Sequence, residues 1–286
     1  MARTVPTGSH ADEVAQGSRF EFGENWRAFL AGLDEARIEE AEKSLREMLE
    51  VPDLAGRSFL DVGSGSGLFS LAARRLGASV TSFDYDPQSV ACTEELRRRY
   101  FAGTDQWRVV EASALDEGFM ASLGTYDVVY AWGSLHHTGA MWRAIDLTAE
   151  RVKPGGRLFI AIYNDMGWAS HTWRWVKHSY NSLPPALRWI VLWPAFAWIW
   201  GPMVIIDALR GKGPLSRWRN YARNRGMSAW RDVVDWVGGY PYEVASIPAL
   251  EDHLRPLGFS ATKVEDVKRG RFRRGHGCNQ IVFSRA

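Results

Sequence analysis

The fold of this 286-residue chain is predicted most clearly by the stretch Phe59-Leu60-Asp61-Val62-Gly63-Ser64-Gly65-Ser66-Gly67-Leu68-Phe69. An apolar run ends at Val62, three glycines alternate with serines, and a helical pattern of apolar residues starts at Leu68. Glycine adopts positive φ and lets a ligand approach the backbone closely. The free N–H groups at the start of the next helix would face that ligand. The stretch therefore predicts a strand, a ligand-binding turn and a helix.

Segments with strand and helix patterns alternate around this turn. Apolar runs predict strands at Ser58–Val62, Ser79–Phe83, Trp107–Val110, Tyr126–Trp132 and Arg157–Tyr163, and helical spacing predicts helices at 38–49, Pro87–Tyr100 and 140–152. This alternation is typical of a parallel α/β sheet. A helix at 248–257 and strands at Ala261–Val267 and Cys278–Ser284 complete a seven-stranded sheet. The last two strands lack a helix between them, so we expect them to pair antiparallel.

An acidic residue at the end of the second strand indicates a nucleoside ligand. Asp84 follows Gly65 by nineteen residues, where its carboxylate can accept hydrogen bonds from two ribose hydroxyls. Asp86-Pro87 instead predicts the N-cap of the next helix. The glycine spacing differs from the GxGxxG fingerprint of dinucleotide-binding proteins, which argues against an NAD-dependent oxidoreductase.

Four segments in this order resemble the motifs of class I S-adenosylmethionine (SAM) methyltransferases. They are the glycine stretch, Glu111–Ala114, Tyr126–His137 and Val152–Leu158, and together they cover about residues 57–163. The resemblance is closest to the small-molecule enzymes of the ubiquinone-biosynthesis type. It implies a Rossmann-like fold, SAM as cofactor and methyl transfer to an O, N or C of an apolar or aromatic small molecule. The alternative is a SAM-binding enzyme of another reaction type, or a non-catalytic SAM-binding partner subunit on a membrane.

The resemblance also implies which residues hold the cofactor. The methionine end is expected at Asp61, Gly63, Ser64, Gly65 and Gly67, the ribose at Asp84 with Tyr85, and the adenine at Ser113 and Ala114, with Trp132 as a further contact. Ser113 stands where many members of the family carry an aspartate.

Candidate catalytic residues follow the same edge of the sheet, where the methyl acceptor is expected. His136 is the first candidate for a general base, ahead of its neighbour His137, because histidine titrates near neutral pH. Tyr163 at the tip of the fifth strand and Glu243 are the other candidates. The alternatives without a catalytic role are that the two histidines only position the backbone around the cofactor, and that Glu243 is a surface residue at the start of a helix. Two adjacent histidines are a poor metal pair, and we predict no metal site.

Composition and charge limit the classes of protein. Hydrophobic residues make up 46% of the chain and the net charge is +2, which indicates a globular protein and does not favour a nucleic-acid partner. Two cysteines are too few for a disulfide scaffold. The first twenty residues contain no apolar run, so we expect a cytoplasmic protein. Residues before Arg19 are polar and unpatterned, and we expect a mobile terminus there.

Residues 164–245 interrupt the alternating pattern and differ in composition. Ten of the 14 tryptophans lie there, and Trp189–Ile206 contains no charged residue. Pro194, Gly201 and Pro202 interrupt this run, which argues against a membrane span. Three interpretations remain: a helical cap over an apolar acceptor pocket, peripheral membrane contact through 189–225, and a homodimer contact.

The chain is thus expected to divide into four parts. They are N-terminal cap helices at 1–55, a SAM-binding core at 56–163, the tryptophan-rich insertion at 164–245, and the last helix and strands at 246–286. A basic loop at 268–276 has two interpretations, recognition of an anionic group on the acceptor or a solvated hairpin tip.

Overall fold

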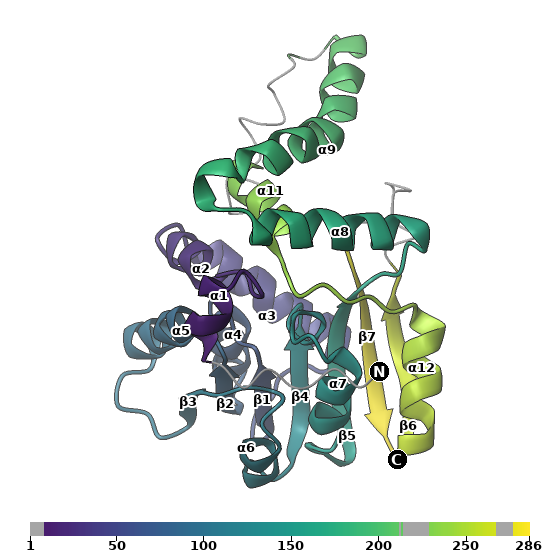
Figure 1. Ribbon diagram of the computed structural model, residues 1–286. Coiled ribbons are helices and arrows are strands. Elements are labelled where there is room, and N and C mark those ends of the chain that lie inside the picture. Colours follow the sequence, from purple (N-terminus) through teal and green to yellow (C-terminus); the bar gives the residue numbers. More distant parts are fainter. Residues whose placement is uncertain (1–8, 212, 214–228, 267–276) are drawn as a thin grey trace.

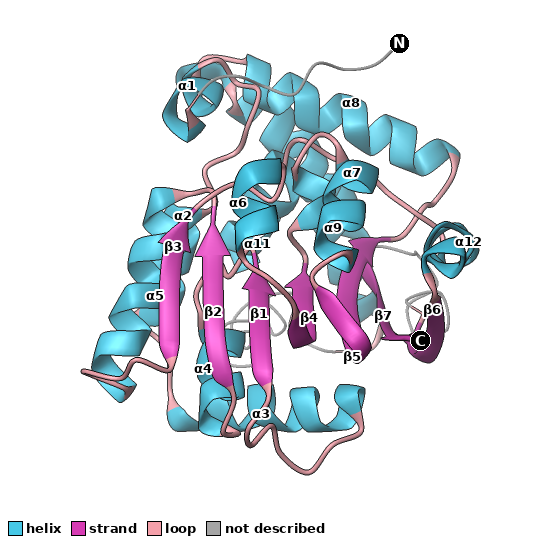
Figure 2. Ribbon diagram, turned by 90° about the horizontal axis from the view of Figure 1, so that it is seen from below, coloured by secondary structure: helices cyan, strands magenta, loops and turns pink. Residues whose placement is uncertain are grey.

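The computed structural model describes residues 9–211, 213, 229–266 and 277–286, and a seven-stranded sheet forms its centre (Figure 1). The strands are β1 (Ser58–Val62), β2 (Ser79–Asp84), β3 (Trp107–Glu111), β4 (Tyr126–Trp132), β5 (Val152–Tyr163), β6 (Phe259–Glu265) and β7 (Cys278–Arg285). Their order in the sheet is β3-β2-β1-β4-β5-β7-β6 (Figure 2). Only β7 pairs antiparallel with its neighbours, so the predicted fold class is confirmed.

Helices cover both faces of the sheet because successive strand side chains point to opposite faces. Phe59 belongs to an apolar cluster shared with α3 (Glu35–Leu49), α4 (Leu68–Arg75) and α5 (Pro87–Tyr100). The next residue, Leu60, belongs to a second cluster, and its helices are α6 (Glu117–Ser122), α7 (Met141–Ala149) and α12 (Ile247–Leu254). Two short 3₁₀ turns follow strand β4 and helix α12: η1 at Leu135–His137, whose Leu135 belongs to the second cluster, and η3 at Arg255–Leu257, which has no buried residue.

The fifth strand begins earlier than predicted. Val152 pairs with Tyr126, and regular pairing resumes between Val128 and Arg157 after a shift of register. Lys153, Pro154 and Gly155, which stand between the predicted helix and the predicted strand, therefore lie inside β5 at an irregularity of its pairing. Helix α6 has no counterpart among the predicted elements, although Asp116 caps it by accepting the N–H of Phe119.

The expectation of a mobile terminus before Arg19 is wrong for the part of that segment that is described, residues 9–18. Helix α1 (His10–Ala15) begins with a capping box between Ser9 and Asp12. Glu13 is buried and its carboxylate accepts a hydrogen bond from Arg19 Nε at 2.5 Å. Arg19 also donates to the backbone carbonyl of His137 at 2.9 Å. These contacts fix α1, followed by α2 (Gly23–Leu30), over the carboxyl edge of the sheet.

The insertion forms its own layer above that edge (Figure 1). It contains α8 (Trp168–Ser182), η2 (Pro185–Leu187), α9 (Trp189–Leu209) and α11 (Ala229–Gly238). The three α-helices share a third apolar cluster. Asn164 and Ala245 form an isolated bridge, and the Ala245 N–H donates to the Tyr163 carbonyl at 3.0 Å. The insertion therefore leaves the sheet and returns to it at one point beside the tip of β5.

Candidate active site

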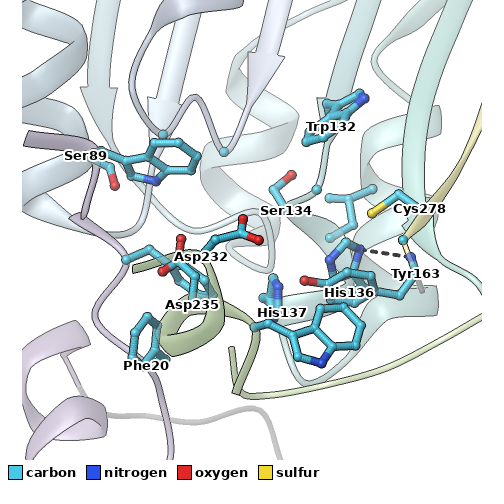
Figure 3. Close-up of a pocket in the computed structure, with 18 of the residues that line it drawn as sticks. Phe20, Ser89, Trp132, Ser134, His136, His137, Tyr163, Asp232, Asp235 and Cys278 are labelled. Carbon is cyan, nitrogen blue, oxygen red and sulfur yellow. Dashed lines mark hydrogen bonds between the residues drawn. The ribbon is translucent and has the colours of Figure 1, made fainter. Parts of the chain in front are cut away.

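One cavity of about 1170 Å³ follows the carboxyl edge of the sheet. At one end it is lined by the glycine turn and the tip of β2, and at the other by the turn after β4 and the tip of β5 (Figure 3). Helices α9 and α11 of the insertion also line it, and Asp232 and Asp235 of α11 lie between Ser89 and Tyr163 (Figure 3). Ligands of open parallel sheets bind at this edge, so the fold places a ligand-binding space where the sequence predicts one.

The glycine turn has a backbone that only glycine accommodates. Gly63, Gly65 and Gly67 have φ values of 76°, 55° and 79°. A Cβ on Gly63 would lie 2.3 Å from the Cβ of Ser134, and a Cβ on Gly65 would lie 3.1 Å from the ring of Trp26. Gly63 and Gly65 line the cavity. The turn thus presents bare backbone to a ligand, as glycine permits.

Asp84 lies at the end of β2 and its carboxylate lines the cavity. Its two oxygens accept the N–H groups of Gly65 and Asp86, both at 2.9 Å. Burial raises the pKa of Asp84 to about 6, and these hydrogen bonds oppose the rise. The group is therefore ionised above that pH, and its remaining lone pairs can accept hydroxyl donors. Asp86 accepts the Gln88 N–H at 2.8 Å, which confirms it as the N-cap of α5.

Asp61 ends a directed chain of buried hydrogen bonds beneath the turn. The indole N–H of Trp107 can only donate, and it bonds Ser82 Oγ at 2.9 Å. Ser82 bonds Ser70 at 2.6 Å, and Ser70 donates to Asp61 Oδ2 at 2.5 Å. Burial raises the pKa of Asp61 to about 7 despite this bond, and the charge of Asp84 adds to the rise. Asp61 supports the turn from below and is not part of the cavity lining.

The other predicted cofactor residues divide into two groups. Tyr85, Ser113, Ala114 and Trp132 line the cavity, whereas Ser64 and Gly67 do not. Ser64 Oγ bonds the hydroxyl of Thr93 at 3.0 Å, and Gly67 precedes the first residue of α4. The Ser113 hydroxyl accepts the N–H of Leu115, so part of its capacity is already used. Ser64 and Gly67 therefore hold the shape of the turn.

His136 belongs to η1, the turn after β4, and is fully buried beside the tip of β5. Its Nδ1 accepts the backbone N–H of Tyr163 at 3.4 Å, and the two rings lie 3.9 Å apart. Within the described part of the chain, Nε2 has no hydrogen-bond partner. Burial keeps the pKa of His136 well below its ordinary value. This arrangement favours a neutral ring with its proton on Nε2, which makes His136 a hydrogen-bond donor.

His137 has the opposite arrangement. Its Nδ1 lies 2.7 Å from the backbone carbonyl of Pro241, and because a carbonyl only accepts, Nδ1 carries the proton. Burial lowers the pKa of His137 to about 3, so the ring is neutral and Nε2 keeps its lone pair. Both histidines line the cavity (Figure 3). Of the two, His137 has the geometry of a base, although the sequence put His136 first.

An aromatic wall surrounds these histidines on the side of the insertion. The ring of Tyr163 lies 5.3 Å from Trp236 and 5.4 Å from Tyr242. Behind this wall, Lys177 of α8 is fully buried, with its Nζ 4.3 Å from the centre of the Trp236 ring and donating to the Trp236 carbonyl. Burial lowers the pKa of Lys177 to about 7, against the charge of Asp235, which raises it. The charge of Lys177 in turn lowers the pKa of both histidines.

Glu243 lies outside the cavity lining, contrary to its expected place at the reacting centre. Its Oε2 accepts the N–H of Met141 at 2.9 Å, the first residue of α7, whose N-cap residue makes no side-chain cap. Its own N–H donates to the His136 carbonyl. A carboxylate at a helix N-terminus is stabilising, and the geometry assigns Glu243 to capping α7 and holding the chain beside η1.

The sequence did not indicate Lys177 or Pro241. It also did not indicate Asp232 and Asp235, the two carboxylates of α11 that line the cavity (Figure 3). Helical spacing offered one signal, because Lys177 lies four residues after Trp173 on the buried face of α8. The basic loop at 268–276 lies outside the described residues. Among the residues that are described, no group of three or more His, Cys, Asp or Glu is arranged to hold a metal ion.

Comparison with known proteins reveals one family. The family model described as "Methyltransferase domain" matches residues 33–200, more than half of the chain. A ubiquinone biosynthesis O-methyltransferase of Xanthomonas oryzae pv. oryzae is 32% identical over 112 residues, which cover 39% of this chain and 45% of that protein. A ribosomal protein L11 methyltransferase of Methylococcus capsulatus is 36% identical over 116 residues, 40% of this chain and 36% of that protein. The aligned part thus spans less than half the length of these curated relatives.

Solved structures share the fold across nearly the whole chain. Magnesium protoporphyrin IX methyltransferase from Synechocystis PCC 6803, with bound SAM, superposes with a TM-score of 0.55 over 98% of this chain and 100% of that chain, at 12% identity. The 1,6-didemethyltoxoflavin-N1-methyltransferase of Burkholderia thailandensis gives a TM-score of 0.51 over 100% and 93%, at 15% identity. At such identities the likeness concerns the fold alone.

Proposed function

Because this chain belongs to the class I SAM-dependent methyltransferases, whose cofactor is SAM, we propose that it methylates an O, N or C of an apolar or aromatic small molecule. One observation carries this proposal: a single cavity joins the glycine turn and Asp84 to the histidine pair and the aromatic wall of the insertion. A cofactor at one end and an acceptor at the other would therefore meet without leaving the protein.

The residues at the first end fit SAM. The bare turn at Gly63 and Gly65 leaves room for the methionine part, Asp84 can accept two ribose hydroxyls, and Ser113 with Ala114 can flank the adenine. When bound, SAM supplies a methyl group already activated by its sulfonium. The protein then has to align the acceptor and exclude water. The N-terminal segment, held by the Glu13–Arg19 pair, closes one side of the cavity and serves the second task.

The other end fits an apolar or aromatic acceptor. Its walls include Trp200, Met203 and Trp236. Proteins of similar fold are named for porphyrin and toxoflavin substrates, which are also ring compounds, and this supports a ring-containing acceptor here. The proposal has four further parts. The loop at 268–276 would recognise an anionic group on the acceptor, and the chain would divide into the four parts given above. The protein would form a homodimer and would be cytoplasmic.

We assign the proton transfer to His137. Its Nε2 would accept the O–H or N–H of the acceptor and take up the proton as the acceptor bonds to carbon. The Pro241 carbonyl would hold the imidazole in position and stabilise the ring when it becomes protonated. His136 would donate from Nε2 to the acceptor, and Tyr163 would pack against its ring. A free amine would need these groups chiefly for orientation, because its lone pair is already available and the product can lose its proton to water, whereas an acceptor that reacts through carbon would also give its proton to His137.

Formation of S-adenosylhomocysteine (SAH) with a panel of phenols, amines and quinones tests the proposal. A methyltransferase forms SAH and a methylated product in equal amounts with at least one acceptor class. SAM binding without SAH formation from any acceptor would favour the alternative of a non-catalytic SAM-binding subunit. Conversion of SAM to products other than SAH would indicate another reaction type.

A further inference from the structure

Helix α9 has apolar side chains on all sides, which a cap over a cavity does not require. Its buried residues, which face the protein, are Leu192, Ala195, Trp200 and one acidic residue, Asp207. The remaining surface carries a second set of large apolar side chains, all exposed: Trp189, Ile190, Trp193, Trp198, Ile205, Ile206 and Leu209. A helix that is apolar on every side needs an apolar environment on every side.

The length and exposure of α9 separate it from an ordinary core helix. It has 21 residues and is apolar enough to cross a membrane, the only such helix within the described ranges. Only 17% of its most apolar window is buried, whereas a core helix would be mostly buried. Figure 1 shows α9 extending away from the sheet and its covering helices. Pro194 and Pro202 lie inside it, and it is continuous with a globular enzyme, so contact along its side suits it better than a span.

The sequence that leads into and through this helix has a one-sided charge. From Trp168 to Arg210 the sequence contains a single acidic residue, Asp207, and that residue is buried. Arg188 precedes α9 and Arg210 follows it. Tryptophan and arginine together are typical of segments that lie at the headgroup level of a bilayer, where arginine meets lipid phosphate and the indole N–H stays near water. A water-facing surface would not gather exposed apolar groups in this way.

The mouth of the cavity opens at the same surface. Trp198 and Ile206 both line the cavity, yet 69% and 43% of their surfaces are exposed. Arg210 also lines it and is exposed at the end of the helix. A surface that covered the exposed side of α9 would therefore cover the entrance to the acceptor end of the cavity.

We propose that the exposed side of α9 docks on an anionic lipid bilayer and that the cavity opens toward that bilayer. The cap interpretation of the insertion then applies to the side of α9 that faces the cavity, and the membrane interpretation applies to its exposed side. The docking surface does not depend on the catalytic assignment. Delivery of a bilayer-dissolved acceptor through this mouth does rest on the proposed function.

Vesicle flotation tests the docking surface. The full chain is mixed with vesicles of phosphatidylcholine and phosphatidylglycerol, and in parallel with phosphatidylcholine alone. We expect flotation with the mixed vesicles and less with the neutral ones. The double variant Ile205→Gln/Leu209→Gln removes two exposed side chains that do not line the cavity, and it should lower the partition coefficient about tenfold. Leu257→Gln, an equally simple change at an exposed site in η3, should bind as the unchanged protein does.

Other outcomes would overturn the proposal. Absence of binding to either vesicle, or equal binding to both, would exclude an anionic bilayer as the partner. Self-association that the double variant abolishes, without vesicle binding, would assign the surface to a second copy of this chain. SAM affinity, measured on the same samples, keeps the two proposals separate, because neither Ile205 nor Leu209 touches the cavity.

Discussion

The Nδ1 atom of His137 donates to the backbone carbonyl of Pro241 over 2.7 Å, across 104 residues of sequence. This bond fixes the tautomer of a buried imidazole and leaves its Nε2 lone pair available. The carbonyl belongs to the segment that closes the insertion, so the return of the chain to the sheet also orients the imidazole of His137, our proposed base. The next residue but one, Glu243, caps α7 and fixes the same segment.

The first prediction concerns the base. His137→Asn keeps a donor for the Pro241 carbonyl but removes Nε2, and kcat for a hydroxyl acceptor should fall about 100-fold or more. SAM affinity should stay unchanged, since the variant leaves the glycine turn intact. His136→Asn is the matched comparison and should cost less in kcat. A larger loss in His136→Asn than in His137→Asn would reverse the assignment.

The second prediction concerns Asp84. Asp84→Asn removes the charged acceptor and should weaken SAM binding about 10- to 100-fold, measured by titration calorimetry. Since the pKa of Asp84 is about 6, SAM affinity of the unchanged protein should also decline as the pH falls through that value, and this decline should be absent in the variant. Asp34→Ala, which removes the side-chain cap of α3 away from the cavity, should lower stability by about 1 kcal/mol and leave affinity unchanged. Wild-type affinity in Asp84→Asn would refute the ribose assignment.

The third prediction separates the two roles considered for Glu243. Glu243→Ala should lower the free energy of unfolding by about 1 kcal/mol, because the Met141 N–H loses its acceptor. The kcat of the folded variant should change only a few-fold. If kcat fell more than about 100-fold while stability and SAM affinity stayed the same, Glu243 would be the base after all.

The fourth prediction uses the buried lysine. The pKa of Lys177 is about 7 in the folded protein against an ordinary value of 10.5. Between these values the unfolded chain holds a proton that the folded protein lacks, so this group adds stability as the pH rises from 7 toward 10.5. Lys177→Met lacks the titrating group. The stability of the unchanged protein relative to this variant should therefore increase with pH, as measured by urea unfolding.

A control for this experiment is Lys43→Met, a change on the exposed surface of α3. Its stability relative to the unchanged protein should stay level over the same pH interval. If the stability difference between the unchanged protein and Lys177→Met also stayed constant over this pH interval, Lys177 would keep its proton in the folded protein. The pH effect assigned to it would then be absent.

The sequence predicted those parts of the fold that local patterns determine. Strands β1 and β4 and helix α5 have the predicted bounds, the helix because Asp86-Pro87 marks its start. Helix α1 was missed because it is short and polar, and its fixed position depends on Glu13 meeting Arg19 across the N-terminal turn. The early start of β5 depends on pairing with Tyr126, which no local pattern at Lys153-Pro154-Gly155 indicates.

The two ends of the cavity also differ in how far they could be predicted from local sequence patterns. The cofactor end comes from consecutive strand tips, so Gly65 and Asp84 could be placed from spacing alone. The acceptor end joins residues far apart in sequence, and the roles of His137 and Lys177 depend on Pro241 and Trp236, which only the folded chain brings near. Adjacent histidines could not be distinguished before the partner of each nitrogen was known.

Isothermal titration of SAM, SAH and NADH into the purified protein tests whether the glycine turn and Asp84 bind SAM. We expect SAM and SAH to bind with dissociation constants on the order of micromolar, NADH not to bind, and Asp84→Asn to weaken the binding of both adenosyl ligands. Binding of NADH, or no heat from SAM and SAH in a folded sample, would contradict it.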